Sequence, residues 1–168
     1  MTGSRVIVAL RVPATPTRAF AAFTEGIAQW WQPNGLFQFA IGRTGTLVFE
    51  PGPTGRLVET YPGGDLVEIG RVRVWDPPRR LVLGWRQAGF APDEQTELRV
   101  TFDDVSTGAA PCTRVTVEHI GWDTIAASGA ARHGFPLREL QLRFAQWWRL
   151  LLGGLGEVAD PATRTNPR

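Results

Sequence analysis

Residues 136–158, PLRELQLRFAQWWRLLLGGLGEV, are the stretch of sequence that decides the fold. The apolar positions recur there at steps of four, three, four and four residues: Leu140, Phe144, Trp147, Leu151 and Leu155. This spacing is that of one face of an α-helix, and Pro136 suits the first helical position. The stretch therefore predicts one amphipathic helix, about 30 Å long, with Arg143 and Arg149 beside its apolar stripe.

The chain before this helix alternates mostly with the period of β-strands. Residues 5–12 predict a first strand, which Pro13 ends. Further short runs lie between turns rich in glycine and proline and predict antiparallel strands. These runs are 36–41, 46–50, 56–61, 66–75, 80–86, 96–102 and 113–120.

Two short helices are expected between the first strand and these runs. Thr15 and Pro16 suit the start of the first helix, and Thr24 suits the cap of a second. The second helix carries Ile27, Trp30 and Trp31 and is ended by Pro33.

The order of elements indicates an α+β fold in which a curved antiparallel sheet of six to seven strands wraps around the long C-terminal helix. We expect a single domain over residues 1–158 and a flexible polar tail over 159–168.

Composition excludes several classes of function. All 18 basic residues are arginine, so lysine chemistry is excluded. The net charge is only +2 and the arginines are scattered, which argues against nucleic-acid binding. No apolar run approaches the ~20 residues of a membrane helix, and the N-terminus lacks the apolar core of a signal peptide. A cytoplasmic protein that contacts neither nucleic acid nor membrane is expected.

Metal and cofactor sites are not expected either. The two histidines, His119 and His133, and the single cysteine, Cys112, lie too far apart in sequence for a metal-binding motif. The glycine-rich segments suit hairpin turns rather than a phosphate cradle, and no nucleophile motif is present.

Four local patterns, taken together, resemble the START-like (SRPBCC, Bet v 1-like) superfamily with its helix-grip fold. They are PTRAF (16–20) with FT (23–24); WW (30–31); GRV (70–72) with WDPPRRL (75–81) and Trp85; and TRV (113–115) with HIGW (119–122). Within the superfamily they are most similar to the branch related to the activator of Hsp90 ATPase, over about residues 5–156. The resemblance implies a cavity between sheet and helix that often takes a hydrophobic ligand. It does not imply one reaction, because the superfamily includes binders, cyclases and dehydratases.

The expected pocket combines that implied cavity with the inward positions of the strands and the helix. Its candidate residues are Trp31, Arg73, Trp75, Trp85, Val117, His119, Phe144, Trp147 and Leu151. The many tryptophan and phenylalanine side chains suit either the lining of an open cavity or the filling of a closed one.

His119 has two interpretations. Strand alternation turns it inward with Val115 and Val117, while Glu118 faces the other way. It is either a neutral acid–base group beside a ligand, with Asp123 as a conceivable partner, or a structural histidine bonded to a backbone carbonyl or a tryptophan.

Arg73 also has two interpretations. If it shares the inward face with Trp75, it needs an anion or carboxylate to meet it, which suits a carboxylate-bearing ligand. Alternatively, a bulge or an edge position exposes it to solvent.

Three functions follow. The first is non-enzymatic binding of a hydrophobic or aromatic small molecule by a monomer or homodimer. The alternative is a cyclase- or dehydratase-type enzyme that uses His119 as acid and base. The third is a chaperone ATPase regulator, which we do not favour because the chain begins almost at its first strand, without a separate chaperone-binding domain before it.

Overall fold

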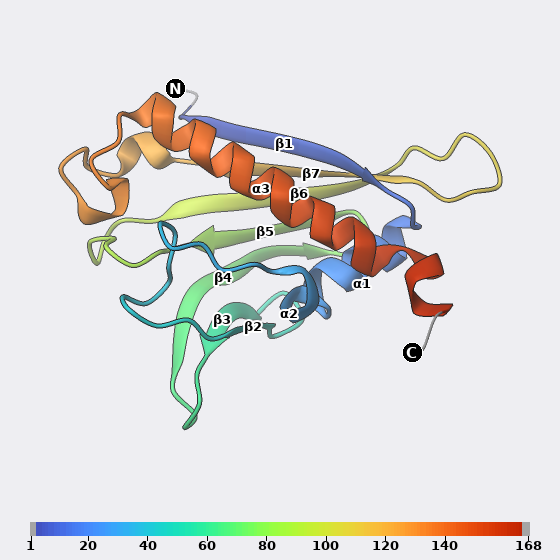
Figure 1. Ribbon diagram of the computed structural model, residues 1–168, viewed down its shortest axis with the longest axis horizontal. Helices are drawn as coiled ribbons and strands as arrows, with labels where there is room; N and C mark the ends of the chain where they lie inside the picture. The colour runs from blue at the N-terminus through green and yellow to red at the C-terminus, as the bar shows by residue number, and fades with distance from the viewer. Residues whose placement is uncertain (1–2, 166–168) are drawn as a thin grey trace.

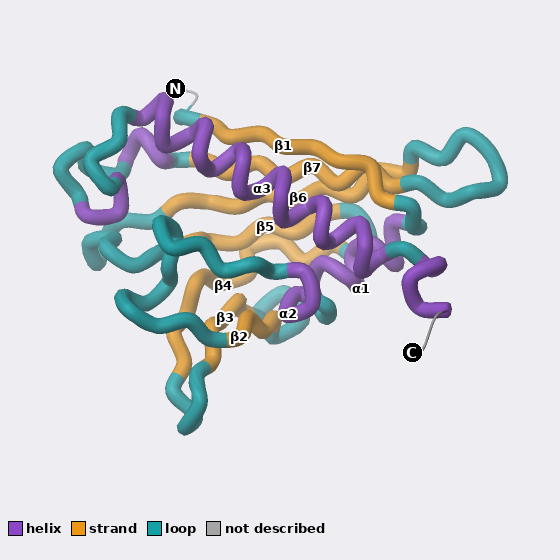
Figure 2. Tube along the Cα trace, viewed as in Figure 1, coloured by secondary structure: helices purple, strands orange, loops and turns teal. Residues whose placement is uncertain are grey.

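The computed structural model describes residues 3–165 and contains a seven-stranded antiparallel sheet (Figure 1). The strands are β1 (Arg5–Val12), β2 (Thr46–Phe49), β3 (Arg56–Thr60), β4 (Leu66–Asp76), β5 (Arg80–Trp85), β6 (Thr96–Asp104) and β7 (Thr113–Ile120). Their order in space is β1-β7-β6-β5-β4-β3-β2. Figure 2 shows the strands as one curved layer, with the helices on its concave side. The predicted α+β fold is confirmed.

The helix α3 (Leu137–Ala159) runs across the concave face of the sheet (Figure 1). All five residues of the predicted stripe are buried: Leu140, Phe144, Trp147, Leu151 and Leu155. Trp148 and Leu152 are buried too, because a sheet that curves around the helix covers more than one narrow stripe. The side of α3 turned to solvent carries the exposed Leu142 and Leu150.

The first short helix, α1 (Pro16–Thr24), begins as predicted, since the Thr15 side chain accepts a hydrogen bond from the Arg18 N–H. The prediction that Thr24 caps the second helix is wrong. The Thr24 hydroxyl donates instead to the Phe20 carbonyl of its own helix. The second helix, α2 (Ile27–Trp30), has Gly26 at its N-cap without a side-chain cap bond.

β4 belongs to two parts of the sheet and bends between them. Its first half pairs with β3 and its second half with β5. The bend lies at Gly70, where a side-chain carbon would collide with the carbonyl oxygen of Gly84. Beyond this bend, β2 and β3 lie on the side of the sheet where α2 contacts β2 (Figure 1).

The strand predicted at 36–41 does not form. The segment is part of an irregular loop, residues 32–45, which has only an isolated bridge between Ala40 and Arg43. Gly42 takes a positive φ of 74° there, which a strand does not use. Phe37 and Phe39 are nevertheless buried, so the alternation in the sequence correctly indicated buried side chains but not a paired strand.

The structure describes only the first part of the chain end that was expected to be a flexible tail, 159–168. α3 includes Ala159, and Pro161–Thr165 forms a 3-10 turn, η3; the remainder of the expected tail lies outside the described residues. Two further 3-10 turns, η1 (Trp122–Thr124) and η2 (Ala130–Arg132), precede α3. None of the helices within residues 3–165 combines the length and hydrophobicity needed to cross a membrane.

Candidate functional site

An aromatic cluster fills the space between the sheet and α3. Trp85 projects from β5, and Trp147 and Trp148 project from α3. The Trp31 ring, at the end of α2, lies among them, with its centroid 5.1 Å from that of Trp147 and 5.9 Å from those of Trp85 and Trp148. These candidate residues are therefore brought together, and the interior is packed with rings.

Two further rings enter this cluster from the loop 32–45, which we call the plug loop. Phe37 lies with its centroid 3.9 Å from that of Phe144 and stacks on Trp147 at 5.2 Å. Phe39 contacts Trp85 at 5.3 Å. Sequence reasoning placed neither phenylalanine in the pocket.

The plug loop is weakly tied to the rest of the molecule. Within residues 3–165 its main chain makes two hydrogen bonds to other elements. The Ala88 N–H donates to Gln38 O at 2.9 Å, and the Trp147 indole N–H donates to Gln32 O at 3.3 Å. Most of what holds the loop is therefore the burial of its two rings and an Arg43–Asp65 ion pair at the surface.

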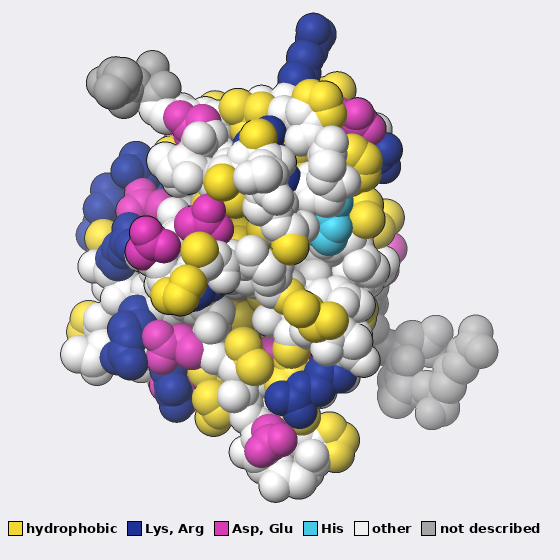
Figure 3. Space-filling view, turned by 90° about the vertical axis from the view of Figure 1, so that its left-hand side faces the viewer, with side chains coloured by type: hydrophobic (Ala, Val, Ile, Leu, Met, Phe, Trp, Pro, Cys, Tyr) yellow, Lys and Arg dark blue, Asp and Glu magenta, His cyan; other side chains and the backbone are white. Residues whose placement is uncertain are grey.

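Figure 3 looks at the end of the molecule where the plug loop meets the loops that precede β6 and α3. Hydrophobic side chains reach the surface at several points across this face. A recess of about 260 Å³ lies between the plug loop and η2, and Leu36, Ala88 and His133 are among its lining residues. This end is where the aromatic interior comes nearest to solvent through irregular structure.

His119 lies at the centre of the core with none of its surface exposed. Its Nε2 is 2.8 Å from the Thr96 hydroxyl oxygen, and that hydroxyl donates to the Trp85 carbonyl. Because the Thr96 proton is already used, the Nε2 atom of His119 is the donor to Thr96. Burial lowers the pKa of His119 to about 3, so the imidazole is neutral.

This arrangement suits a structural histidine better than an acid–base group. Asp123, the conceivable partner, instead accepts a hydrogen bond from the Ser4 N–H at 2.9 Å. The observed partner is a hydroxyl group, not the backbone carbonyl or tryptophan that the sequence suggested. No carboxylate among the described residues bonds His119.

Three polar atoms in this part of the core have no hydrogen-bond partner among the described residues: His119 Nδ1, Trp122 Nε1 and Trp148 Nε1. The neutral Nδ1 is an acceptor and the two indole groups are donors. The His119 ring lies 5.3 Å from that of Trp122 and 5.4 Å from that of Trp85, which in turn contacts Trp148. Leaving such a group unpaired costs about 1–3 kcal/mol.

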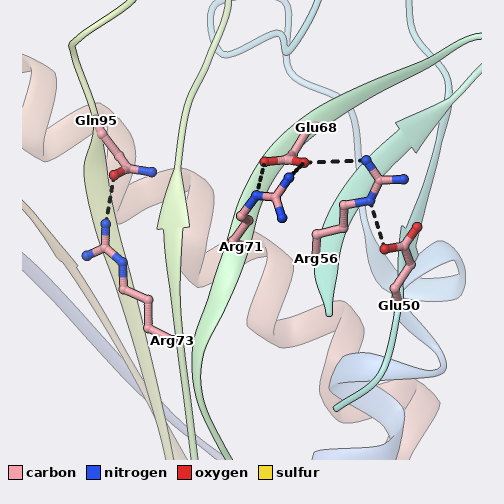
Figure 4. A network of polar contacts seen from close by, with 6 residues as sticks. All are labelled: Glu50, Arg56, Glu68, Arg71, Arg73 and Gln95. Atoms are coloured by element: carbon pink, nitrogen blue, oxygen red, sulfur yellow. Dashed lines mark hydrogen bonds and ion pairs between the residues drawn. The ribbon is translucent and has the colours of Figure 1, made fainter. Parts of the chain in front are cut away.

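Arg73 does not join the interior. The register of β4 against β5 shifts between Val72 and Val74, and this irregularity exposes Arg73, as the second interpretation required. Its guanidinium donates to Glu97 at 2.6 Å and to Gln95 at 2.7 Å. Figure 4 shows Arg73 and Gln95 in front of the strands, with α3 behind them.

The other candidates divide between two regions. Val117 and Leu151 are fully buried in the core, on β7 and α3. Trp75 is half-buried, and its ring packs edge-on against Phe20 of α1 at 5.2 Å. It therefore lies with a second aromatic group near α1 and not with the Trp31–Trp85–Trp147 cluster.

A polar pair missed by sequence reasoning lies beneath the plug loop. Glu59 of β3 is 4% exposed, and its Oε1 accepts a hydrogen bond from the hydroxyl of Tyr61, which is 7% exposed. Glu59 lies two residues from both Leu57 and Tyr61 and therefore shares their face of the strand. This spacing is a signal in the sequence that Glu59 faces inward.

The described residues contain no cluster of three or more potential metal ligands.

Comparison with known proteins places this geometry in a family. The model of the family described as activator of Hsp90 ATPase homolog 1-like protein matches residues 13–160. A search of curated proteins found no matching sequence.

Solved structures share the fold over nearly the whole chain. Protein MLL2253 from Mesorhizobium loti has a TM-score of 0.63 at 18% identity and covers 98% of this chain and 100% of its own. CalC from Micromonospora echinospora, described as a self-sacrificing resistance protein, has a TM-score of 0.59 at 25% identity, with coverage of 98% and 99%. PFC0360w from Plasmodium falciparum, described as an Hsp90 activator, has a TM-score of 0.57 at 18% identity, with coverage of 90% and 97%.

Proposed function

The chain belongs to the activator of Hsp90 ATPase homolog 1-like family, whose fold is known to bind small hydrophobic ligands. From this premise we propose that it binds an aromatic, largely apolar small molecule between the sheet and α3. In the closed form, the rings of Phe37 and Phe39 occupy the space that the rings of the ligand take.

The observation that carries this proposal is that the rings of Phe37 and Phe39 come from a loop and not from the sheet or α3. The centre of the fold is filled by side chains of an irregular loop, while the surrounding Trp85, Trp147 and Phe144 come from the sheet and the helix. Withdrawal of the loop leaves the sheet and α3 in place and uncovers an aromatic wall. Flat aromatic molecules fit such a wall because offset and edge-to-face ring contacts recur at 4.5–7 Å, roughly the spacing of the plug rings.

The unpaired polar atoms support the same site. His119 Nδ1 accepts a hydrogen bond, and the indole N–H groups of Trp122 and Trp148 donate. A ligand that carries a few polar groups on an apolar frame satisfies atoms that the protein alone leaves unpaired. Binding sites of this composition, mostly apolar with few polar groups, are the common type for small molecules.

No reaction is assigned to the site. His119 is neutral and fully buried, and its hydrogen-bonded neighbour is a threonine hydroxyl, not a carboxylate that would make it a general base. The likeness to an Hsp90 activator at 18% identity concerns the fold alone, so chaperone regulation is not proposed.

The test is a titration of the protein with fatty acids and with fused-ring aromatic alcohols, followed by tryptophan emission. Trp31, Trp85 and Trp147 surround the plug rings, so a bound aromatic molecule changes their emission. We expect saturable binding of the aromatic compounds.

The double variant Phe37→Ala/Phe39→Ala sharpens this test. Without the plug rings, binding no longer requires an opening step, and we expect the affinity to rise by about tenfold. Ile41→Ala is the matched control, because Ile41 lies on the same loop and is 84% exposed. Flat titrations for the parent and the double variant would overturn the proposed function.

A further inference from the structure

Glu59 is a carboxylate on the inner, apolar face of the sheet. The register places it opposite Leu47 on β2 and opposite Val67 on β4. Leu47 is buried and Val67 packs against the core. Glutamates are almost never fully buried unless they are paired with a cation or hydrogen-bonded.

Glu59 has a single polar partner. The Tyr61 hydroxyl donates to Oε1, and no other hydrogen bond or ion pair reaches Glu59 from the described side chains. The nearby cation, Arg43, stacks on the Tyr61 ring with its guanidinium carbon 3.8 Å from the ring centroid and pairs with Asp65 at 3.4 Å. The second oxygen, Oε2, therefore has acceptor capacity that the protein does not use.

The free oxygen belongs to a side chain that borders the aromatic interior. A space of about 10 Å³, room for about one water molecule, lies beneath the plug loop. Glu59 lines it together with Trp31, Phe37 and Phe39, the same rings that form the aromatic cluster. Movement of these two phenylalanines enlarges this space and joins it to the interior.

The end of the plug loop passes close beside Glu59. A side-chain carbon at Gly45 would lie 2.9 Å from Glu59 Cγ and would collide with the Thr60 carbonyl oxygen. Only glycine lets the main chain pass this close. The loop thus begins its path into β2 in direct contact with the Glu59 side chain.

We propose that Glu59 is the polar anchor of the ligand site and accepts, at Oε2, a hydrogen bond from an O–H or N–H group on an aromatic ligand. This inference rests on the proposed function and names the ligand class of the same site. Tyr61 occupies Oε1 with its hydrogen bond and leaves Oε2 to the ligand. Burial raises the pKa of Tyr61 to about 12, so its hydroxyl remains a donor at neutral pH.

The test compares three probes of similar size: 2-naphthol, 2-naphthylmethylamine and 2-methylnaphthalene. The first two carry a hydroxyl or an ammonium donor, and the third carries none. For the parent protein we expect the better donor probe to bind about tenfold more tightly than 2-methylnaphthalene, because 2-methylnaphthalene buries Oε2 without a hydrogen-bond partner. The ranking of the two donors identifies the group that Glu59 prefers.

Glu59→Gln keeps the shape of the side chain and its bond to Tyr61 but removes the charge. We expect this variant to lose most of the preference for the donor probe while binding 2-methylnaphthalene as the parent does. Glu68→Gln is the matched control, since Glu68 pairs with Arg56 and Arg71 on the side of the sheet away from α3 (Figure 4). Tyr61→Phe is expected to retain the preference, because Oε2 is unchanged.

The outcomes separate the two proposals. If all three probes bind the parent with equal affinity, the role of Glu59 is overturned and the aromatic site stands. The same holds if Glu59→Gln keeps the full preference. If no probe binds either the parent or the Phe37→Ala/Phe39→Ala variant, the proposed function falls and the role of Glu59 falls with it. The comparison of probes on the parent needs no variant, so misfolding of Glu59→Gln does not remove the test.

Discussion

At the scale of single residues, His119 makes the stability of the protein depend on pH. Burial lowers the pKa of His119 in the folded protein to about 3, from 6.5 in the unfolded chain. Between these two pH values the unfolded chain therefore binds a proton that the folded protein does not bind. The stabilising contribution is complete above pH 6.5 and is lost as the pH falls toward 3. Between about pH 6.5 and pH 4.5, before most carboxyls are protonated, the slope approaches about 1.4 kcal/mol per pH unit.

Urea unfolding at a series of pH values measures this slope. His119→Gln does not titrate, so its free energy of unfolding is expected to be nearly flat over the same range, whatever its absolute value. A parent protein whose stability does not change between pH 6.5 and pH 4.5 would contradict the burial of a neutral imidazole.

Tyr61 gives a second titration at the alkaline end. The sequence holds one tyrosine, so the phenolate absorbance in the near ultraviolet belongs to Tyr61 alone. We expect it to appear with a midpoint near 12 in the folded protein and near 10 in urea, because burial first and the bond to Glu59 second raise the pKa of Tyr61. The neutral Tyr61 hydroxyl contributes its full share of the free energy of unfolding below pH 10, and this contribution is lost as the pH rises through 12. A folded midpoint near 10 would place Tyr61 in solvent.

At the scale of elements, α3 is held by its buried stripe. Trp147 is 4% exposed and contacts Trp31, Phe37 and Phe144. Trp147→Ala is expected to lower the free energy of unfolding by about 3–5 kcal/mol, as large aromatic truncations in cores do. Arg149, exposed on the same helix, is the control, and Arg149→Ala is expected to stay within about ±0.5 kcal/mol. Equal small effects in urea unfolding would mean that the stripe is not buried.

Two adjacent glycines in α3 provide a matched pair. A side-chain carbon at Gly153 meets nothing within 4 Å, whereas one at Gly154 lies 3.2 Å from the Trp30 carbonyl oxygen. Gly153→Ala is expected to stabilise the protein by about 0.5–1 kcal/mol through helix propensity. Gly154→Ala gains the same propensity but pushes against α2, so its melting temperature is expected to lie below that of Gly153→Ala. A melting temperature of Gly154→Ala above that of Gly153→Ala would show that α2 shifts without cost to make room for the added methyl group.

The elements that could be predicted from sequence are those whose pattern is long and local. The stripe of α3 and the first strand at 5–12 repeat their period often enough to fix both type and face. The predictions for Thr24 and for 36–41 are wrong for local reasons. A threonine hydroxyl can cap the next helix or donate to a carbonyl of its own helix, and an alternating pair of phenylalanines is buried equally well by a loop. The strand period marked Glu59 as inward, but its place beneath the plug loop depends on contacts distant in sequence.

At the scale of the whole molecule, the fold has a firmly paired part and a part that is tied to it by few hydrogen bonds. The firm part is the sheet from β1 through β7 to β4 together with α3, which buries its stripe against the sheet (Figure 1). The other part is the plug loop, which lacks strand pairing and is tied mainly through Phe37 and Phe39. Segments with few backbone hydrogen bonds open at lower free energy than core strands. The plug loop is therefore expected to open without global unfolding, which would give the proposed ligand a way in.

Hydrogen exchange in low concentrations of urea tests this division. The Ala88 amide, bonded to Gln38 O, reports the plug loop, and the Val100 and Val117 amides report the paired strands β6 and β7. We expect the Ala88 amide to exchange by a local opening with a smaller free energy and little dependence on urea, because that opening exposes little new surface. Val100 and Val117 are expected to exchange only by global unfolding, with the full dependence on urea. If Ala88 exchanged with the same free energy and urea dependence as Val117, the loop would be part of the cooperative core, and a ligand would have no independent way in.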